Sequence, residues 1–191
     1  MEYTDYQELV NKYYEFDNRE VNYQNRVIIP FLEDLFGDEY DIVDVSHLTK
    51  QWKTINREAF AGDYTPDLLV AKNWNLNQEG GVTPKYLLLI EVKSPSARDR
   101  NHAEEEIKEY RQKVDSVILT DCVTWEFFKK EDKIKDIHFE QEMTIKFPKK
   151  EYKHPAKVCK RYATDEIEWK KDAEIWKQLR ETIKKLVKEN I

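Results

Sequence analysis

The sequence lacks any long hydrophobic run and contains few cysteines. No apolar stretch in its 191 residues approaches the roughly 18 residues that a membrane-spanning helix requires. The N-terminus, Met1-Glu-Tyr-Thr-Asp5, is acidic and polar, unlike a secretory signal peptide. The two cysteines, Cys122 and Cys159, lie far apart and lack the spacing of metal ligands. We therefore expect a cytoplasmic protein with free thiols and no membrane contact.

Histidines are also scarce, and they show no regular spacing. The four residues are His47, His102, His138 and His154. A zinc site would need histidines or cysteines at close, regular intervals. The sequence therefore does not predict a zinc site.

The chain has an excess of acidic residues but contains one basic segment. A net charge of −6 argues against a protein that coats nucleic acid by bulk electrostatic attraction. Sixteen consecutive residues nevertheless contain a single acid, Glu151, and a group of cations: Lys146, Lys149, Lys150, Lys153, Lys157, Lys160 and Arg161. This segment is either a solvated linker or a patch that contacts DNA phosphates without reading the base sequence.

Hydrophobic periodicity predicts alternating helices and strands. Helices are expected over residues 4–18, about 19–36 with an interruption at Pro30, and about 100–114. Strands are expected over residues 40–48, 64–71, 85–93, 116–120, 124–128 and 134–139. The fold class is therefore α/β, with a mixed central sheet flanked by helices. We divide the chain into a domain over 1–145, a basic linker over 146–163 and a C-terminal region over 164–191.

The C-terminal region is predicted to form a long amphipathic helix from about residue 165. Its apolar residues recur every three or four positions: Trp169, Ala173, Trp176, Leu179, Ile183, Leu186 and Val187. Such a stripe packs against the helix's own domain, or it docks a partner or leads into a further domain. The sequence leaves both interpretations open.

The most unusual stretch runs from Lys85 to Pro95. Four apolar residues, Leu87 to Ile90, lead directly into Glu91-Val92-Lys93. Because side chains alternate along a strand, Glu91 and Lys93 are expected on one face. Charged groups at the end of a buried strand cost free energy unless they are paired or bind a ligand.

A second acidic residue precedes the neighbouring predicted strand. Asp67 follows Pro66, and pairing of the two strands would bring Asp67 close to Glu91 and Lys93. Carboxylate oxygens suit Mg²⁺, with Mn²⁺ as the alternative ion. Lys93 could then orient or deprotonate a water molecule, or neutralise charge that develops on a phosphate.

These residues resemble the signature of the PD-(D/E)XK nuclease superfamily, in which Pro66-Asp67 is followed by Glu91-Val92-Lys93. Within the superfamily, the chain is most similar to the N-terminal nuclease domain of type I restriction enzyme motor subunits. Glu20 with the later segment 30–37 resembles that family's opening helix. The segment 117–127 resembles its strand, tight turn and second strand. The resemblance covers about residues 18–130.

The resemblance implies a restriction-endonuclease-like core over residues 1–145 and Mg²⁺-dependent hydrolysis of DNA. Asp67 and Glu91 would bind the metal, Glu20 would reach it directly or through water, and Lys93 would position the attacking water. DNA would be the substrate, and further domains or subunits of a restriction complex would be partners. The family context implies restriction of foreign DNA.

The sequence departs from the family at one position. The helix after the lysine usually carries Gln-x-x-x-Tyr, whereas this chain has Glu106 four residues before Tyr110. An ionised glutamate cannot donate a hydrogen bond, and it adds negative charge. We treat both residues as auxiliary to the site.

Simpler interpretations remain for each candidate. Glu91 and Lys93 could form a surface ion pair of little energetic value, and Asp67 could be a turn residue. Glu20 could lie in a first helical turn because of the helix dipole, with Glu15 as its competitor for the metal. For the whole chain, the alternatives are a repair or recombination nuclease, or a nonenzymatic DNA-binding or assembly subunit.

Overall fold

The computed structural model describes residues 1–48, 57–75, 82–95, 100–130, 132–140 and 167–191. The helices are α1 (Tyr3–Phe16), α2 (Glu20–Tyr23), α3 (Ile29–Phe36), α4 (Arg100–Tyr110) and α5 (Ala173–Glu189). The strands are β1 (Asp41–Asp44), β2 (Leu68–Lys72), β3 (Lys85–Val92), β4 (Ser116–Thr120), β5 (Thr124–Lys129) and β6 (Asp132–His138). The predicted basic linker, with all seven of its cations, lies outside the described residues.

The strands form one six-stranded sheet in the order β1-β2-β3-β4-β5-β6. Neighbouring strands are antiparallel except β3 and β4, which are parallel and are connected through α4. A parallel pair requires such a crossover, because the chain must return to the same end of the sheet. The predicted α/β class with a mixed sheet flanked by helices is confirmed.

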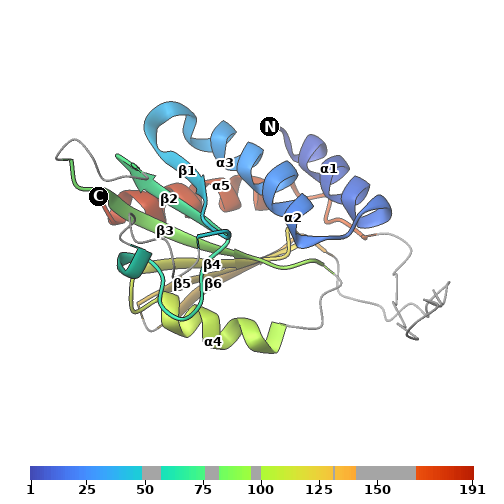
Figure 1. Ribbon diagram of the computed structural model, residues 1–191. Helices are drawn as coiled ribbons and strands as arrows, with labels where there is room; N and C mark the ends of the chain where they lie inside the picture. Colours follow the sequence, from blue (N-terminus) through green and yellow to red (C-terminus); the bar gives the residue numbers. More distant parts are fainter. Residues whose placement is uncertain (49–56, 76–81, 96–99, 131, 141–166) are drawn as a thin grey trace, which may run out of the picture.

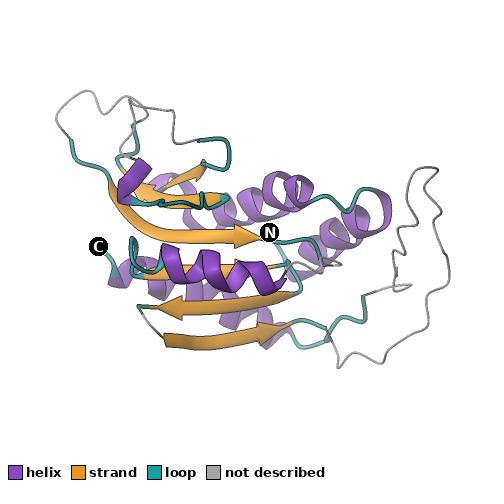
Figure 2. Ribbon diagram, turned by 60° about the horizontal axis from the view of Figure 1, so that its bottom comes forward, coloured by secondary structure: helices purple, strands orange, loops and turns teal. Residues whose placement is uncertain are grey.

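Helices cover both faces of the sheet, as Figure 1 shows. On one face, α1, α3 and α5 share a core with the sheet that is rich in aromatic rings, including Tyr6, Phe31, Trp125 and Trp176. On the other face, α4 lies along the strands (Figure 2) and packs through Ala103, Ile107 and Tyr110 into a separate core. These two layers exclude water from both sides of the middle strands, which explains the continuous apolar run of β3.

The predicted interruption at Pro30 is present as a change of helix type. A π-helical segment, Gln24–Ile28, joins α2 to α3, and Pro30 lies in the first turn of α3. Proline cannot donate a main-chain hydrogen bond and collides with the carbonyl four residues earlier, so a regular α-helix cannot continue through it. The helix ends at Gly37, whose φ of 56° is favoured by glycine.

The C-terminal helix begins later than the sequence predicted. It starts at Ala173, because the Asp172 side chain accepts a hydrogen bond from the Glu174 N–H and thereby caps the helix. Trp169 lies before the helix, in an isolated bridge with Glu140. The buried residues of α5 are Trp176, Leu179, Ile183, Leu186 and Val187, and they join the aromatic core. These five residues of the predicted stripe pack on the sheet, whereas Ala173 is exposed. None of the helices in the described ranges is long and apolar enough to cross a membrane.

Candidate functional site

Asp67 and Glu91 lie opposite each other at one end of the β2–β3 hairpin. Leu68 pairs with Ile90, and extending this antiparallel register by one residue places Asp67 across from Glu91. Directly opposed residues carry their side chains on the same face of a sheet. The sequence predicted Asp67 within the strand, but the structure places it directly before β2. Its carboxylate accepts a hydrogen bond of 2.7 Å from the Val92 N–H, in place of a main-chain acceptor.

Lys93 follows β3 directly and bridges two carboxylates. Its Nζ lies 2.6 Å from Oε1 of Glu91 and 3.2 Å from Oε2 of Glu106. The other oxygen of Glu91, Oε2, accepts a hydrogen bond of 3.1 Å from the Tyr110 hydroxyl. Glu106 and Tyr110 lie on one face of α4 because they are four residues apart. Helix α4 therefore contacts both members of the Glu91–Lys93 pair.

The pair is largely buried, which separates it from an ordinary surface salt bridge. The side chains of Lys93 and Glu91 are 14% and 7% exposed. Burial and the nearby charge of Asp67 raise the pKa of Glu91, and the Lys93 ammonium limits this rise. Burial alone would lower the pKa of Lys93, but Glu91 and Glu106 outweigh it, so the pKa is raised and Lys93 stays charged.

Asp67 lies in a region of excess negative charge. Burial raises its pKa to about 6, the Val92 N–H and Lys93 oppose this, and the charges of Glu20 and Asp44 add to it. Glu20, at the start of α2, is thus the helical acid whose charge acts on Asp67. Asp44 was missed by the sequence reasoning. Asp44 is the last residue of β1 and pairs with Leu68 of β2. Predicting the pairing of β1 with β2 would therefore have placed Asp44 next to Asp67.

The segment before Asp67 is held by a buried arginine. Arg57 is 5% exposed, and within the part of the chain that the structure describes its guanidinium donates to uncharged acceptors. These are the carbonyls of Leu48, Gly62 and Tyr64 and the hydroxyl of Thr65. The loop that leads into Asp67 is therefore ordered around one side chain. An isolated arginine in a polar loop carries no sequence signal for burial, and the prediction missed its role.

A small polar network connects Glu20's helix to the end of β3. The Asn18 side-chain oxygen accepts hydrogen bonds from the Tyr23 hydroxyl at 2.6 Å and the Ser94 hydroxyl at 3.2 Å. Asn18 precedes Glu20 by two residues, and Ser94 directly follows Lys93. These hydrogen bonds hold the start of α2, and with it Glu20, near the end of β3.

The donor set fits a hard divalent cation in its chemistry. Asp67, Glu91 and the surrounding acids offer carboxylate oxygens, the ligands that Mg²⁺ prefers. Among the described residues, no three His, Cys, Asp or Glu side chains are gathered closely enough to hold a metal. In this arrangement the Lys93 ammonium provides the positive charge beside Glu91. Carboxylates with raised pKa values next to one ammonium indicate that the cluster can accept further positive charge.

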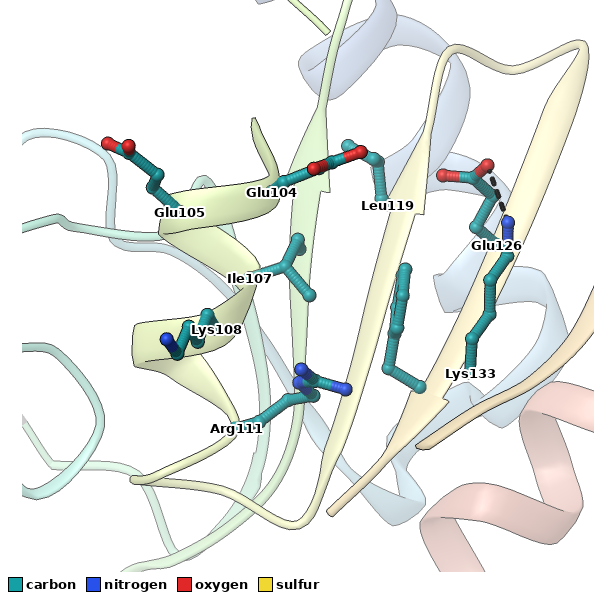
Figure 3. A pocket seen from close by; sticks show the side chains of 9 residues that line it. Glu104, Glu105, Ile107, Lys108, Arg111, Leu119, Glu126 and Lys133 are labelled. Atoms are coloured by element: carbon teal, nitrogen blue, oxygen red, sulfur yellow. Dashed lines mark hydrogen bonds and ion pairs between the residues drawn. The ribbon is translucent and has the colours of Figure 1, made fainter. Parts of the chain in front are cut away.

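A separate pocket of about 600 Å³ lies between α4 and strands β4 to β6 (Figure 3). Its lining combines three acids, three cations and an apolar floor: Glu104, Glu105, Glu126, Lys108, Arg111, Lys133, Ile107, Leu119 and Phe128. Lys133 is paired with Glu126, as the dashed line in Figure 3 shows. None of the predicted catalytic residues lines it. The pocket is therefore distinct from the cluster around Glu91.

Comparison with known proteins found no matching family model, no matching curated protein and no matching solved structure.

Proposed function

We propose that the protein is a Mg²⁺-dependent nuclease that hydrolyses DNA phosphodiester bonds, with its centre at Asp67, Glu91 and Lys93. The observation that carries this proposal is the opposition of Asp67 and Glu91 at one end of the hairpin, with Lys93 bonded to Glu91. A buried carboxylate and a half-buried one, both with raised pKa values and next to one ammonium, are costly in a purely structural role. Perturbed groups of this kind concentrate at functional sites.

The proposal extends to the fold and its context. A restriction-endonuclease-like core is supported by the antiparallel β2–β3 hairpin, the parallel β3–β4 pair and the crossover helix α4 between them. The resemblance of residues 18–130 to type I restriction motor subunits supports a role in restriction of foreign DNA. The basic segment 146–161 would then supply phosphate contacts.

Each residue has a role that follows from its surroundings. Asp67 and Glu91 would hold the divalent ion, Mg²⁺ or Mn²⁺, with Glu20 reaching it directly or through water. When bound, the ion would supply charge neutralisation at the phosphate and a lowered pKa of water. Lys93 would orient the attacking water and stabilise negative charge that develops on the phosphate oxygens. Tyr110 would fix the orientation of Glu91 through its hydroxyl.

A cleavage assay with matched variants tests the proposal. Supercoiled plasmid, single-stranded DNA and a branched junction are each incubated with the purified protein and Mg²⁺. Asp67→Asn, Glu91→Gln and Lys93→Met should each lower the cleavage rate by about 100-fold or more, because each removes a group from the reaction centre. Glu104→Gln, which changes charge on the exposed side of α4, is the control and should cleave normally.

The three substrates separate the proposed role from its rivals. Preference for the junction or the single strand would favour a repair or recombination nuclease over restriction. Cleavage that survives all three site substitutions would overturn the proposed centre. DNA binding without cleavage on every substrate, unchanged by Mg²⁺ and by the three substitutions, would favour a nonenzymatic subunit.

A further inference from the structure

Lys93 lies where a divalent ion would compete with it. Its ammonium is 2.6 Å from Oε1 of Glu91, a proposed metal ligand, and Oε2 of the same carboxylate already accepts the Tyr110 hydroxyl. A second cation cannot approach Oε1 closely while the ammonium remains there, because like charges repel strongly in a partly buried site. Binding of a metal by Glu91 therefore requires the ammonium to withdraw.

Glu106 offers the ammonium a second position. Its Oε2 is 3.2 Å from Lys93 Nζ, and its side chain is 20% exposed compared with 7% for Glu91. A shift of the flexible lysine side chain from Glu91 toward Glu106 keeps the charge paired and moves it toward solvent. A glutamine at position 106 could accept a hydrogen bond but could not neutralise the ammonium.

We infer that Lys93 is a resident cation that occupies the Glu91 carboxylate in the metal-free protein, and that Glu106 receives its ammonium when a divalent ion binds. Glu106 is thus a positioning residue that acts through Lys93. The inference rests on the proposed function, since it assumes that Glu91 binds the ion. It gives a physical role to the residue at which this chain departs from the family pattern.

The test measures Mn²⁺ affinity of the full chain by electron paramagnetic resonance, which reports free Mn²⁺ without any need for cleavage. Lys93→Met should tighten Mn²⁺ binding by about tenfold, because the competing ammonium is gone. Glu106→Gln should weaken it by about tenfold, because the ammonium then stays on Glu91. Glu104→Gln, with the same charge change two residues away on α4, should alter the affinity by less than about twofold.

A double-mutant cycle separates displacement from simple charge effects. If Glu106 acts through Lys93, then Glu106→Gln should have almost no effect on Mn²⁺ affinity in a Lys93→Met background. Additive effects in the double variant would show that the charge of Glu106 acts on the metal ion directly and not through Lys93. This result would overturn the inference.

The underlying metal site is tested separately in the same experiment. Asp67→Asn and Glu91→Gln should each abolish the tight binding of Mn²⁺. If both variants bind as the unchanged protein does, the proposed metal site itself fails. If both lose binding while Lys93→Met and Glu106→Gln leave the affinity unchanged, only the displacement inference fails. Circular dichroism of each variant verifies that the chain is folded.

Discussion

Arg57 and Lys93 are both cations that the fold withdraws from water, but their partners differ in charge. Arg57 donates to three carbonyls and one hydroxyl, all of them neutral. Lys93 instead bridges two carboxylates, Glu91 and Glu106, in a region that also contains Asp67. One cation therefore satisfies main-chain groups of a loop, and the other balances part of an excess of negative charge.

The difference leads to different expectations for substitutions at the two cations. The acceptors around Arg57 are neutral groups of the protein itself, and they offer no negative charge to a bound cation. A guanidinium keeps its charge at any ordinary pH. The carboxylates around Lys93 have raised pKa values, so we expect the stability of this cluster to depend on pH and, if the proposed function holds, on added divalent cations. Substitutions at Arg57 should consequently change stability at every pH, whereas substitutions around Lys93 should change its dependence on pH and metal.

The largest effect is expected from Arg57→Met. The change removes the donor from the buried carbonyl of Leu48 and from the partly buried hydrogen bonds to the carbonyls of Gly62 and Tyr64, and each such loss costs up to about 1–3 kcal/mol before the loop relaxes. We expect the free energy of unfolding in urea to fall by about 3–4 kcal/mol, equally at pH 6 and pH 8.

Arg57→Lys sharpens this test, because it keeps the charge but cannot reach all of the acceptors. The free energy of unfolding of Arg57→Lys should lie between those of the unchanged protein and Arg57→Met. A loss below about 1 kcal/mol for Arg57→Met would contradict the structural role assigned to this side chain.

A smaller effect of opposite sign is expected from Asp67→Asn in the metal-free protein. The folded pKa of Asp67 is about 6, compared with 3.8 for the free side chain. Below pH 3.8 the carboxyl is protonated in both states. Between these values the unfolded chain ionises first, so stability falls as pH rises to 6 and then levels off.

Asparagine cannot ionise, and its side-chain oxygen can still accept the Val92 N–H. The variant should therefore match the unchanged protein near pH 4 and exceed its unfolding free energy at pH 7 by on the order of 2 kcal/mol. The measurement is urea unfolding in EDTA across this pH range. Asp38→Asn, at an exposed position, is the control. Parallel stability curves for the Asp67 variant and the unchanged protein would contradict the raised pKa.

Much of the fold could be predicted from local pattern. The strand over Ser116–Thr120 has the predicted bounds, and the predicted strand next to Asp67 pairs with β3 as considered from the sequence. The beginning of α5 was predicted about eight residues too early, since Asp172 caps the helix. Apolar periodicity continued through Trp169, which packs beside the N-terminal helix in extended conformation. Periodicity alone cannot distinguish these two kinds of packing.

The site was less predictable than the fold, because charge interactions depend on register and on distant elements. Asp67, Glu91 and Lys93 follow from two strands and one pairing. Asp44 required the pairing of a third strand, and Arg57 required the path of a loop. The bond from Lys93 to Glu106 depends on how α4 lies across the sheet, which sequence spacing does not fix.

The smallest effects are expected from removing one hydroxyl at each cation. Thr65→Val deletes an acceptor of Arg57, and Tyr110→Phe deletes the donor to Glu91 Oε2 while keeping the buried ring. Each should lower the free energy of unfolding by about 1 kcal/mol. The loss at Thr65 should be the same at pH 6 and pH 9, since no carboxylate takes part in this hydrogen bond.

The loss at Tyr110 should grow with pH. The pKa of Glu91 is raised by burial and by Asp67, so a substantial fraction of its carboxyl is protonated at pH 6 and ionised only at higher pH. A phenolic donor stabilises the ionised form more strongly than the neutral one. Tyr110→Phe should therefore cost about 0.5 kcal/mol more at pH 9 than at pH 6, measured by urea unfolding in EDTA. If the two hydroxyl deletions show the same pH dependence, the carboxylate cluster does not titrate as inferred, and Lys93 and Arg57 are equivalent structural cations.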